Sequence, residues 1–98
     1  MKYINKSLSI ENIKVKDIAK KFGTPIYCYS HKQLKENINN FKKNFKSFSP
    51  LICFAIKSNT NVHLIKEIKK FGLGADAVSM GELMLALKAG INPKNIVI

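Results

Sequence analysis

The chain has 98 residues, enough for one small domain or for part of a larger one. Hydrophobic residues make up 46% of it, which excludes a disordered tail and indicates a packed core. No apolar run approaches the roughly 20 residues of a membrane-spanning helix, and the polar first residues lack the apolar stretch of a secretory signal. We therefore expect a soluble, cytoplasmic protein that does not bind membranes.

The net charge of +11 raises the question of an acidic partner such as a nucleic acid. All 17 basic residues are lysines, which lack the planar fork with which arginine recognises bases and phosphates. The lysines are also spread along the chain instead of gathering around aromatic side chains. The charge therefore does not favour nucleic-acid binding as the primary function.

The first half of the chain predicts an extended segment, two helices and a strand. Residues 1–14 are extended, with no pairing partner nearby in the sequence. Residues 15–22 have apolar side chains at helical spacing, and Gly23 can end that helix. After the breaker Thr24–Pro25, residues 26–29 are rich in β-forming side chains and predict a strand. Ser30 can cap a second helix that continues to about Phe45.

The second half of the chain alternates apolar strands with helices. A strand is predicted over 51–56, an almost continuous apolar run, and a polar loop over 58–61 leads into a helix. Another strand over 75–78 and a helix over 81–89 follow, before a last apolar strand over 96–98. Because a chain that ends inside an apolar strand is unusual for a complete domain, we expect a truncated part of a larger protein.

This alternation predicts the α/β class, with a parallel sheet covered by helices. Two layouts fit the pattern: a doubly wound open sheet and a (β/α)8 barrel. No Gly-x-Gly-x-x-Gly sequence follows the first strand, so the dinucleotide-binding form of the open sheet has no motif to support it. The two cysteines, Cys28 and Cys53, lie in apolar runs, and no Cys/His cluster with metal-ligand spacing exists. No metal site is predicted.

Lys57 is the candidate catalytic residue that this pattern singles out. It directly follows the apolar run 51–56, and sites in parallel α/β folds form at the carboxyl ends of strands. Continued alternation would put Lys57, Ala55 and Cys53 on one face, which would point into a barrel. A lysine partly removed from water at such a place is suited to Schiff-base chemistry. The alternative is that the strand simply ends there and the side chain reaches solvent.

The chain resembles a known enzyme family around this lysine. Residues 54–59 (Phe-Ala-Ile-Lys-Ser-Asn), followed by Ile65, Ile68 and Gly72 at their spacings, resemble the pyridoxal-phosphate attachment motif of the ornithine/diaminopimelate/arginine decarboxylase family. Residues 22–27 and 74–83 are similar to the barrel opening and the third-strand signature of the members that act on diaminopimelate, with Met80 where a second glycine is usual. The resemblance covers essentially the whole chain but only the N-terminal part of such an enzyme.

The resemblance implies a fold and its division into domains. The α/β part would be the N-terminal part of an alanine-racemase-like (β/α)8 TIM barrel, with residues near the N-terminus belonging to a separate, mostly missing β-domain. Residues 1–24 would form the N-terminal strand and helix of the β-domain and the barrel entry. Residues 25–98 would form the first β/α units of the barrel. The family also implies a homodimer as the complete protein.

The resemblance further implies an enzyme, a pyridoxal-phosphate-dependent carboxy-lyase. Its reaction would be the decarboxylation of meso-2,6-diaminopimelate to L-lysine and CO2, a step of lysine biosynthesis. Lys57 would bind pyridoxal 5'-phosphate through a Schiff base and then carry a proton, and Ala55 would leave room beside the cofactor ring. Asp76 and Glu82 would be catalytic counter-charges to Lys57. Alternatively, Asp76 is a strand-end turn residue, Glu82 is an acid favoured by a helix dipole, and Ala55 is a small residue that fills the barrel.

Other functions stay open alongside this one. A related decarboxylase of ornithine, arginine or carboxynorspermidine would share the same motif. An amino-acid racemase on the same barrel is less favoured, because the opening over 22–25 is typical of the decarboxylases. A non-catalytic basic fragment is the third alternative. Since the family's phosphate-binding and substrate-carboxylate residues have no counterpart among these residues, we expect the chain alone to be inactive.

Overall fold

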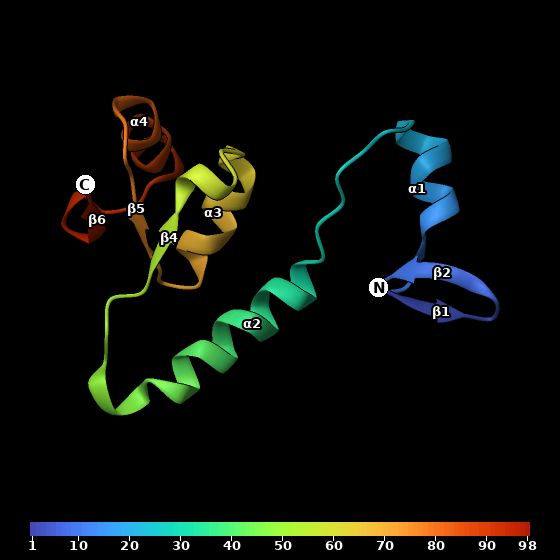
Figure 1. Ribbon diagram of the computed structural model, residues 1–98, viewed down its shortest axis with the longest axis horizontal. Coiled ribbons are helices and arrows are strands. Elements are labelled where there is room, and N and C mark those ends of the chain that lie inside the picture. The colour runs from blue at the N-terminus through green and yellow to red at the C-terminus, as the bar shows by residue number, and fades with distance from the viewer. The chain divides into compact units, whose positions relative to one another are not determined.

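The computed structural model describes all 98 residues, which divide into two compact units, Met1–Phe41 and Lys42–Ile98 (Figure 1). The division falls within one helix, α2 (His31–Asn44). No helix in either unit is long and apolar enough to span a membrane.

The first unit begins with a three-stranded antiparallel sheet of β1 (Lys2–Ile4), β2 (Ser7–Ile10) and β3 (Ile13–Lys14), in that order. Tight turns join the strands, and Asn5 and Lys6 in the first turn have φ values of 47° and 62°. Positive φ at both central residues is typical of a two-residue hairpin turn. The expectation that residues 1–14 lack a nearby partner is therefore wrong, because these strands pair with one another.

Helix α1 (Val15–Phe22) has the predicted bounds and packs against β2. Gly23, at φ 82°, ends it by donating its N–H to the carbonyl of Ala19 at 2.8 Å. The strand predicted over 26–29 is wrong, since these residues belong to neither sheet. β-forming side chains alone do not make a strand when no neighbouring strand in the unit is available to pair with it.

Helix α2 begins where the sequence predicts, because Ser30 caps it. The Ser30 hydroxyl accepts a hydrogen bond from the backbone N–H of Gln33 at 3.0 Å. A short 3-10 turn, η1 (Lys46–Phe48), follows the helix.

The second unit contains a parallel sheet in the strand order β4-β5-β6, with a helix in each connection (Figure 1). The parallel pairing confirms the predicted mixed α/β class. Its strands, helices and 3-10 turns are β4 (Cys53–Ala55), η2 (Ile56–Ser58), α3 (Val62–Lys70), β5 (Gly74–Asp76), α4 (Met80–Ala89), η3 (Pro93–Asn95) and β6 (Ile96–Val97).

Helices α3 and α4 pack on one face of this sheet. Phe54, Ala75 and Ile96 are paired across the strands and contact the same apolar core as Ile65 of α3 and Ala86 of α4. Since neighbouring residues of a strand point to opposite faces, the residues between them lie on the face that α3 and α4 leave uncovered. The core thus determines which side chains of the strands are available for chemistry.

Candidate active site at the carboxyl edge of the parallel sheet

The uncovered face carries two of the predicted site residues side by side. Ala55 and Asp76 end β4 and β5 and are register partners, and Val97 of β6 pairs with Asp76 on its other side. Lys57 follows Ala55 by two residues, beyond the end of the strand. The structure therefore places Ala55, Lys57 and Asp76 at the carboxyl edge of one parallel sheet, where sites of such folds are built.

Lys57 lies in the 3-10 turn η2 and not in the strand. The prediction that it continues the alternation of β4 is therefore wrong, because the strand ends at Ala55 and the turn changes the direction of the backbone. The alternation holds up to Ile56, which lies on the same face as Phe54 and is completely buried in the core. The Lys57 side chain is exposed.

The backbone on both sides of Lys57 is fixed. Ile56 anchors the turn in the core, and its carbonyl accepts the N–H of Asn59 at 2.9 Å. The Ser58 hydroxyl donates to the carbonyl of Ala55 at 2.7 Å. Lys57 is thus an exposed side chain on a turn whose backbone is held by hydrogen bonds.

The polar loop after Lys57 leads directly into α3. The side-chain oxygen of Asn59 accepts the N–H of Asn61 at 3.0 Å, and that of Asn61 accepts the N–H of His63 at 2.9 Å. The second bond is the N-cap of the helix. The polar residues after the lysine therefore hold the loop in one conformation.

Asp76 lies close to Cys53 on the uncovered face. Burial raises the pKa of the Cys53 thiol, and the negative charge of Asp76 raises it further. The Asp76 side chain is half-buried and makes no hydrogen bond or ion pair of its own. Its charge is therefore not neutralised by another side chain of this unit. The alternation of the strand placed Cys53 on this face but assigned it no role.

Glu82 lies in the first turn of α4 and takes part in its capping. One carboxylate oxygen accepts the backbone N–H of Val78 at 2.9 Å, and the Ser79 hydroxyl accepts the N–H of Glu82 at 3.2 Å. This arrangement is a variant of the capping box, with the acid reaching back across the start of the helix. It corresponds to the helix-terminal alternative for Glu82, and a catalytic role for this residue stays a prediction.

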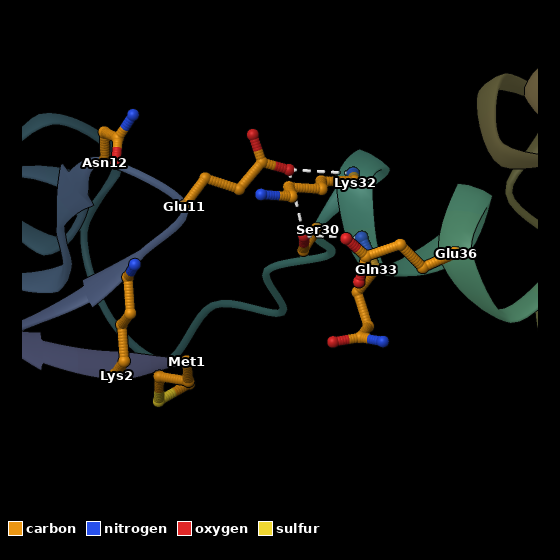
Figure 2. Close-up of a pocket in the computed structure, with 8 residues that line it drawn as sticks. All are labelled: Met1, Lys2, Glu11, Asn12, Ser30, Lys32, Gln33 and Glu36. Atoms are coloured by element: carbon orange, nitrogen blue, oxygen red, sulfur yellow. Dashed lines mark hydrogen bonds between the residues drawn. The ribbon is translucent and has the colours of Figure 1, made fainter.

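The first unit contains a separate polar pocket of about 290 Å³, which holds none of the predicted site residues (Figure 2). Glu11 crosses it, and one of its carboxylate oxygens accepts the Lys32 N–H and the Ser30 hydroxyl, each at 2.9 Å (Figure 2). These two hydrogen bonds lower the pKa of Glu11. Glu11 therefore acts as a second cap for α2. The pocket is lined by Met1, Lys2, Glu11, Asn12, Ser30, Lys32, Gln33 and Glu36.

No group of three or more His, Cys, Asp or Glu side chains in the chain could hold a metal ion. The ionisable groups that the parallel sheet and the turn after β4 present are the amine of Lys57, the carboxylate of Asp76 and the thiol of Cys53.

These features define a class of protein, a β/α protein with a lysine on a fixed turn at the carboxyl edge of its parallel sheet. The family described as "Pyridoxal-dependent decarboxylase, pyridoxal binding domain" matches residues 31–98. The chain belongs to this family, as the resemblance around Lys57 predicted.

Curated relatives extend the match over almost the whole chain. The diaminopimelate decarboxylase of Aquifex aeolicus is 46% identical over 97 residues, which is 99% of this chain and 23% of the relative. That of Helicobacter pylori (strain J99) is 43% identical over 78% of this chain and 19% of the relative. The chain thus spans about a fifth to a quarter of the length of these relatives.

Solved structures agree with these relatives. A crystal structure of an Aquifex aeolicus protein, 46% identical, matches with a TM-score of 0.92 over 97% of this chain and 23% of that one. Diaminopimelate decarboxylase of M. jannaschii, 32% identical, gives a TM-score of 0.93 over the same shares. The Helicobacter pylori enzyme complexed with L-lysine gives 0.76 at 38% identity, over 83% of this chain and 21% of that one.

Proposed function

We propose that this chain supplies the cofactor-binding lysine of a pyridoxal-phosphate-dependent enzyme that converts meso-2,6-diaminopimelate to L-lysine and CO2. The observation that carries the proposal is Lys57, exposed on a rigid turn at the carboxyl edge of the parallel sheet. The family of the chain and the names of its relatives support both the cofactor and the substrate. Nothing in the structure favours the related decarboxylases or a non-catalytic role.

The residues present fit pyridoxal phosphate. Lys57 provides an accessible amine for a covalent bond to the cofactor aldehyde, and Ala55 has a side chain small enough to leave space for a ring. The uncovered face provides an open side of the sheet. The bound cofactor supplies an electron sink that stabilises the negative charge left by the loss of CO2.

Lys57 and Asp76 have complementary tasks in this proposal. Lys57 would hold pyridoxal phosphate through Nζ, and the same amine, when not bonded to the cofactor, could hold or deliver a proton. The charge of Asp76, which no other side chain neutralises, stabilises a positive charge on that atom. The hydrogen-bonded turn fixes the backbone of Lys57, so the side chain always starts from the same place at the edge of the sheet.

The assignment to a (β/α)8 barrel and a separate β-domain is part of the same proposal. The sequential parallel order β4-β5-β6, with both helices on one face, supports the start of a (β/α)8 barrel whose interior is the uncovered face. The N-terminal sheet would belong to a β-domain, with the domains dividing at residues 24 and 25. A homodimer and a cytoplasmic location rest on the family alone.

The cofactor part can be tested on the chain itself. The chain is incubated with a substoichiometric amount of pyridoxal phosphate, reduced with borohydride and digested, and labelled peptides are quantified. We expect the label to concentrate at Lys57 over the other lysines and to disappear from that peptide in Lys57→Ala. Lys66→Ala, which removes an exposed lysine of α3, should not change the label at Lys57. Equal labelling of Lys57 and the surface lysines would refute the assignment.

The substrate part needs the remainder of such an enzyme. These residues can replace the matching segment of the Aquifex aeolicus diaminopimelate decarboxylase, to which they are 46% identical. We expect this chimaera to release CO2 from meso-2,6-diaminopimelate, its Lys57→Ala variant to be inactive and its Lys66→Ala variant to be active. The chain alone should produce no L-lysine. A folded chimaera that releases no CO2 from meso-2,6-diaminopimelate would contradict the proposed function.

A further inference from the structure

We propose that Glu82 is a positioning residue that, together with Ser79, holds Asp76 in place at the edge of the sheet. We call this pair the Ser79–Glu82 clamp. The link to catalysis rests on the proposed function of Lys57 and Asp76, whereas the clamp itself rests on hydrogen bonds in the chain.

The clamp fixes the short connection between Asp76 and α4. Ala77 donates its N–H to a carbonyl of β6 at 2.9 Å, which extends the sheet by one bond beyond Asp76. Val78 donates to the Glu82 carboxylate at 2.9 Å, and the Ser79 hydroxyl accepts the Glu82 N–H at 3.2 Å. Each residue between Asp76 and the helix is therefore hydrogen-bonded, and Glu82 provides the bond at the middle residue.

The helix that carries Glu82 is itself fixed in the core. Ala86 is completely buried and Ala89 is 5% exposed, both against the apolar cluster under the sheet. Helix α4 also packs against η2, the turn that carries Lys57. A shift at the start of α4 would therefore affect both the connection that follows Asp76 and the turn η2 that carries Lys57.

The chemistry of the contact predicts which substitutions it tolerates. Val78 N–H needs an acceptor at this place, and an acid in the first turn also interacts favourably with the helix dipole. Glutamine keeps an acceptor of the same length, whereas alanine removes it. A carboxylate that transferred protons during the reaction could not be replaced by glutamine, so this variant separates the two roles.

Amide hydrogen exchange of the chain tests the clamp without the cofactor. We expect the Val78 amide to exchange about tenfold faster in Glu82→Ala than in the unsubstituted chain, because one hydrogen bond to a charged group is lost. In Glu82→Gln its exchange rate should stay within about threefold of the unsubstituted rate. Asn92→Ala is the matched control, because it removes a comparable cap from η3, where the Asn92 side chain accepts the Lys94 N–H at 3.0 Å. It should leave Val78 unchanged. Unchanged exchange of Val78 in Glu82→Ala would overturn the clamp.

The same variants in the chimaera test the role of the clamp in the reaction. We expect Glu82→Ala to lower kcat/KM about tenfold, Glu82→Gln to restore it to within about threefold, and Asn92→Ala to match the unsubstituted chimaera. Glutamine and alanine variants that are equally impaired would show that Glu82 transfers protons, and the positioning role would be wrong. If the unsubstituted chimaera is inactive, the proposed function fails, while the exchange of Val78 still decides whether the clamp exists.

Discussion

Gly74 begins β5 at a place where the backbone of η3 passes very close to it. A Cβ atom at this position would lie 2.2 Å from the carbonyl oxygen of Asn95 and 3.0 Å from the sulfur of Cys53. The neighbouring oxygen belongs to the backbone and cannot rotate away as a side chain could. Gly74 therefore allows η3 and β5 to approach each other, and β5 is the strand that carries Asp76.

We expect Gly74→Ala to destabilise the unit Lys42–Ile98. The Asn95 oxygen would have to retreat by at least about 0.8 Å to reach the shortest contact that a Cβ tolerates. Overpacking of this kind costs about 1–3 kcal/mol, and the lower chain entropy of alanine offsets about 0.5–1 kcal/mol of it. The net loss in the free energy of unfolding should therefore lie between about 0 and 2.5 kcal/mol, and the middle of both ranges gives about 1 kcal/mol.

Urea unfolding followed by circular dichroism measures this loss, with Gly81→Ala as the matched control. A Cβ at Gly81 would meet only the Ser79 hydroxyl at 3.9 Å, and this position lies in helix α4. The free energy of unfolding of the control should equal that of the unsubstituted chain or exceed it by up to about 1 kcal/mol. If the two variants were equally stable, the close approach at Gly74 would not be the reason for glycine at this position.

Further predictions concern both units. The hydrogen bonds from the start of α2 lower the pKa of Glu11, so the stability they contribute is present above the pKa of the unfolded chain and is lost as the pH falls through the folded value. The melting temperature of the unsubstituted chain should therefore fall more steeply below about pH 4.5 than that of Glu11→Gln. Asp76→Asn should lower the raised pKa of Cys53 and speed its alkylation at neutral pH a few-fold; an unchanged rate would contradict their proximity. Lys42→Met should destabilise the second unit by about 0.5–1 kcal/mol in thermal unfolding, because Lys42 donates to a backbone carbonyl at the end of α3, whereas Lys43→Met should have no effect.

The helices could be predicted closely because their ends depend on residues next to them in the sequence. Gly23 ends α1 and Ser30 caps α2, as the sequence indicated, and α4 ends at Ala89, the predicted last residue. Capping needs only a side chain or a positive φ within a few residues of the helix end. Such signals are present in any local window of the sequence.

The strands of the first unit could not be predicted as well, because pairing depends on turn geometry and on partners. The first hairpin turn uses Asn5 and Lys6 at positive φ, without the glycine that makes such turns recognisable. Residues 26–29 have the composition of a strand, yet no strand of their own unit pairs with them. Composition indicates that a segment can form a strand, whereas the structure depends on whether a neighbour is present.

The candidate site shows the same division between local and distant information. Alternation along β4 placed Ala55 on the uncovered face, but only the parallel register brings Asp76 beside it. The motif identified Lys57, and the strand pattern misplaced it by extending β4 into η2. This difference bears on the proposed chemistry. A lysine at the end of a regular strand would point in a direction set by the sheet, whereas a long side chain on a rigid turn can change direction while its backbone stays fixed. The 3-10 turn thus combines a fixed backbone with a long, exposed side chain, which fits the role proposed for Lys57.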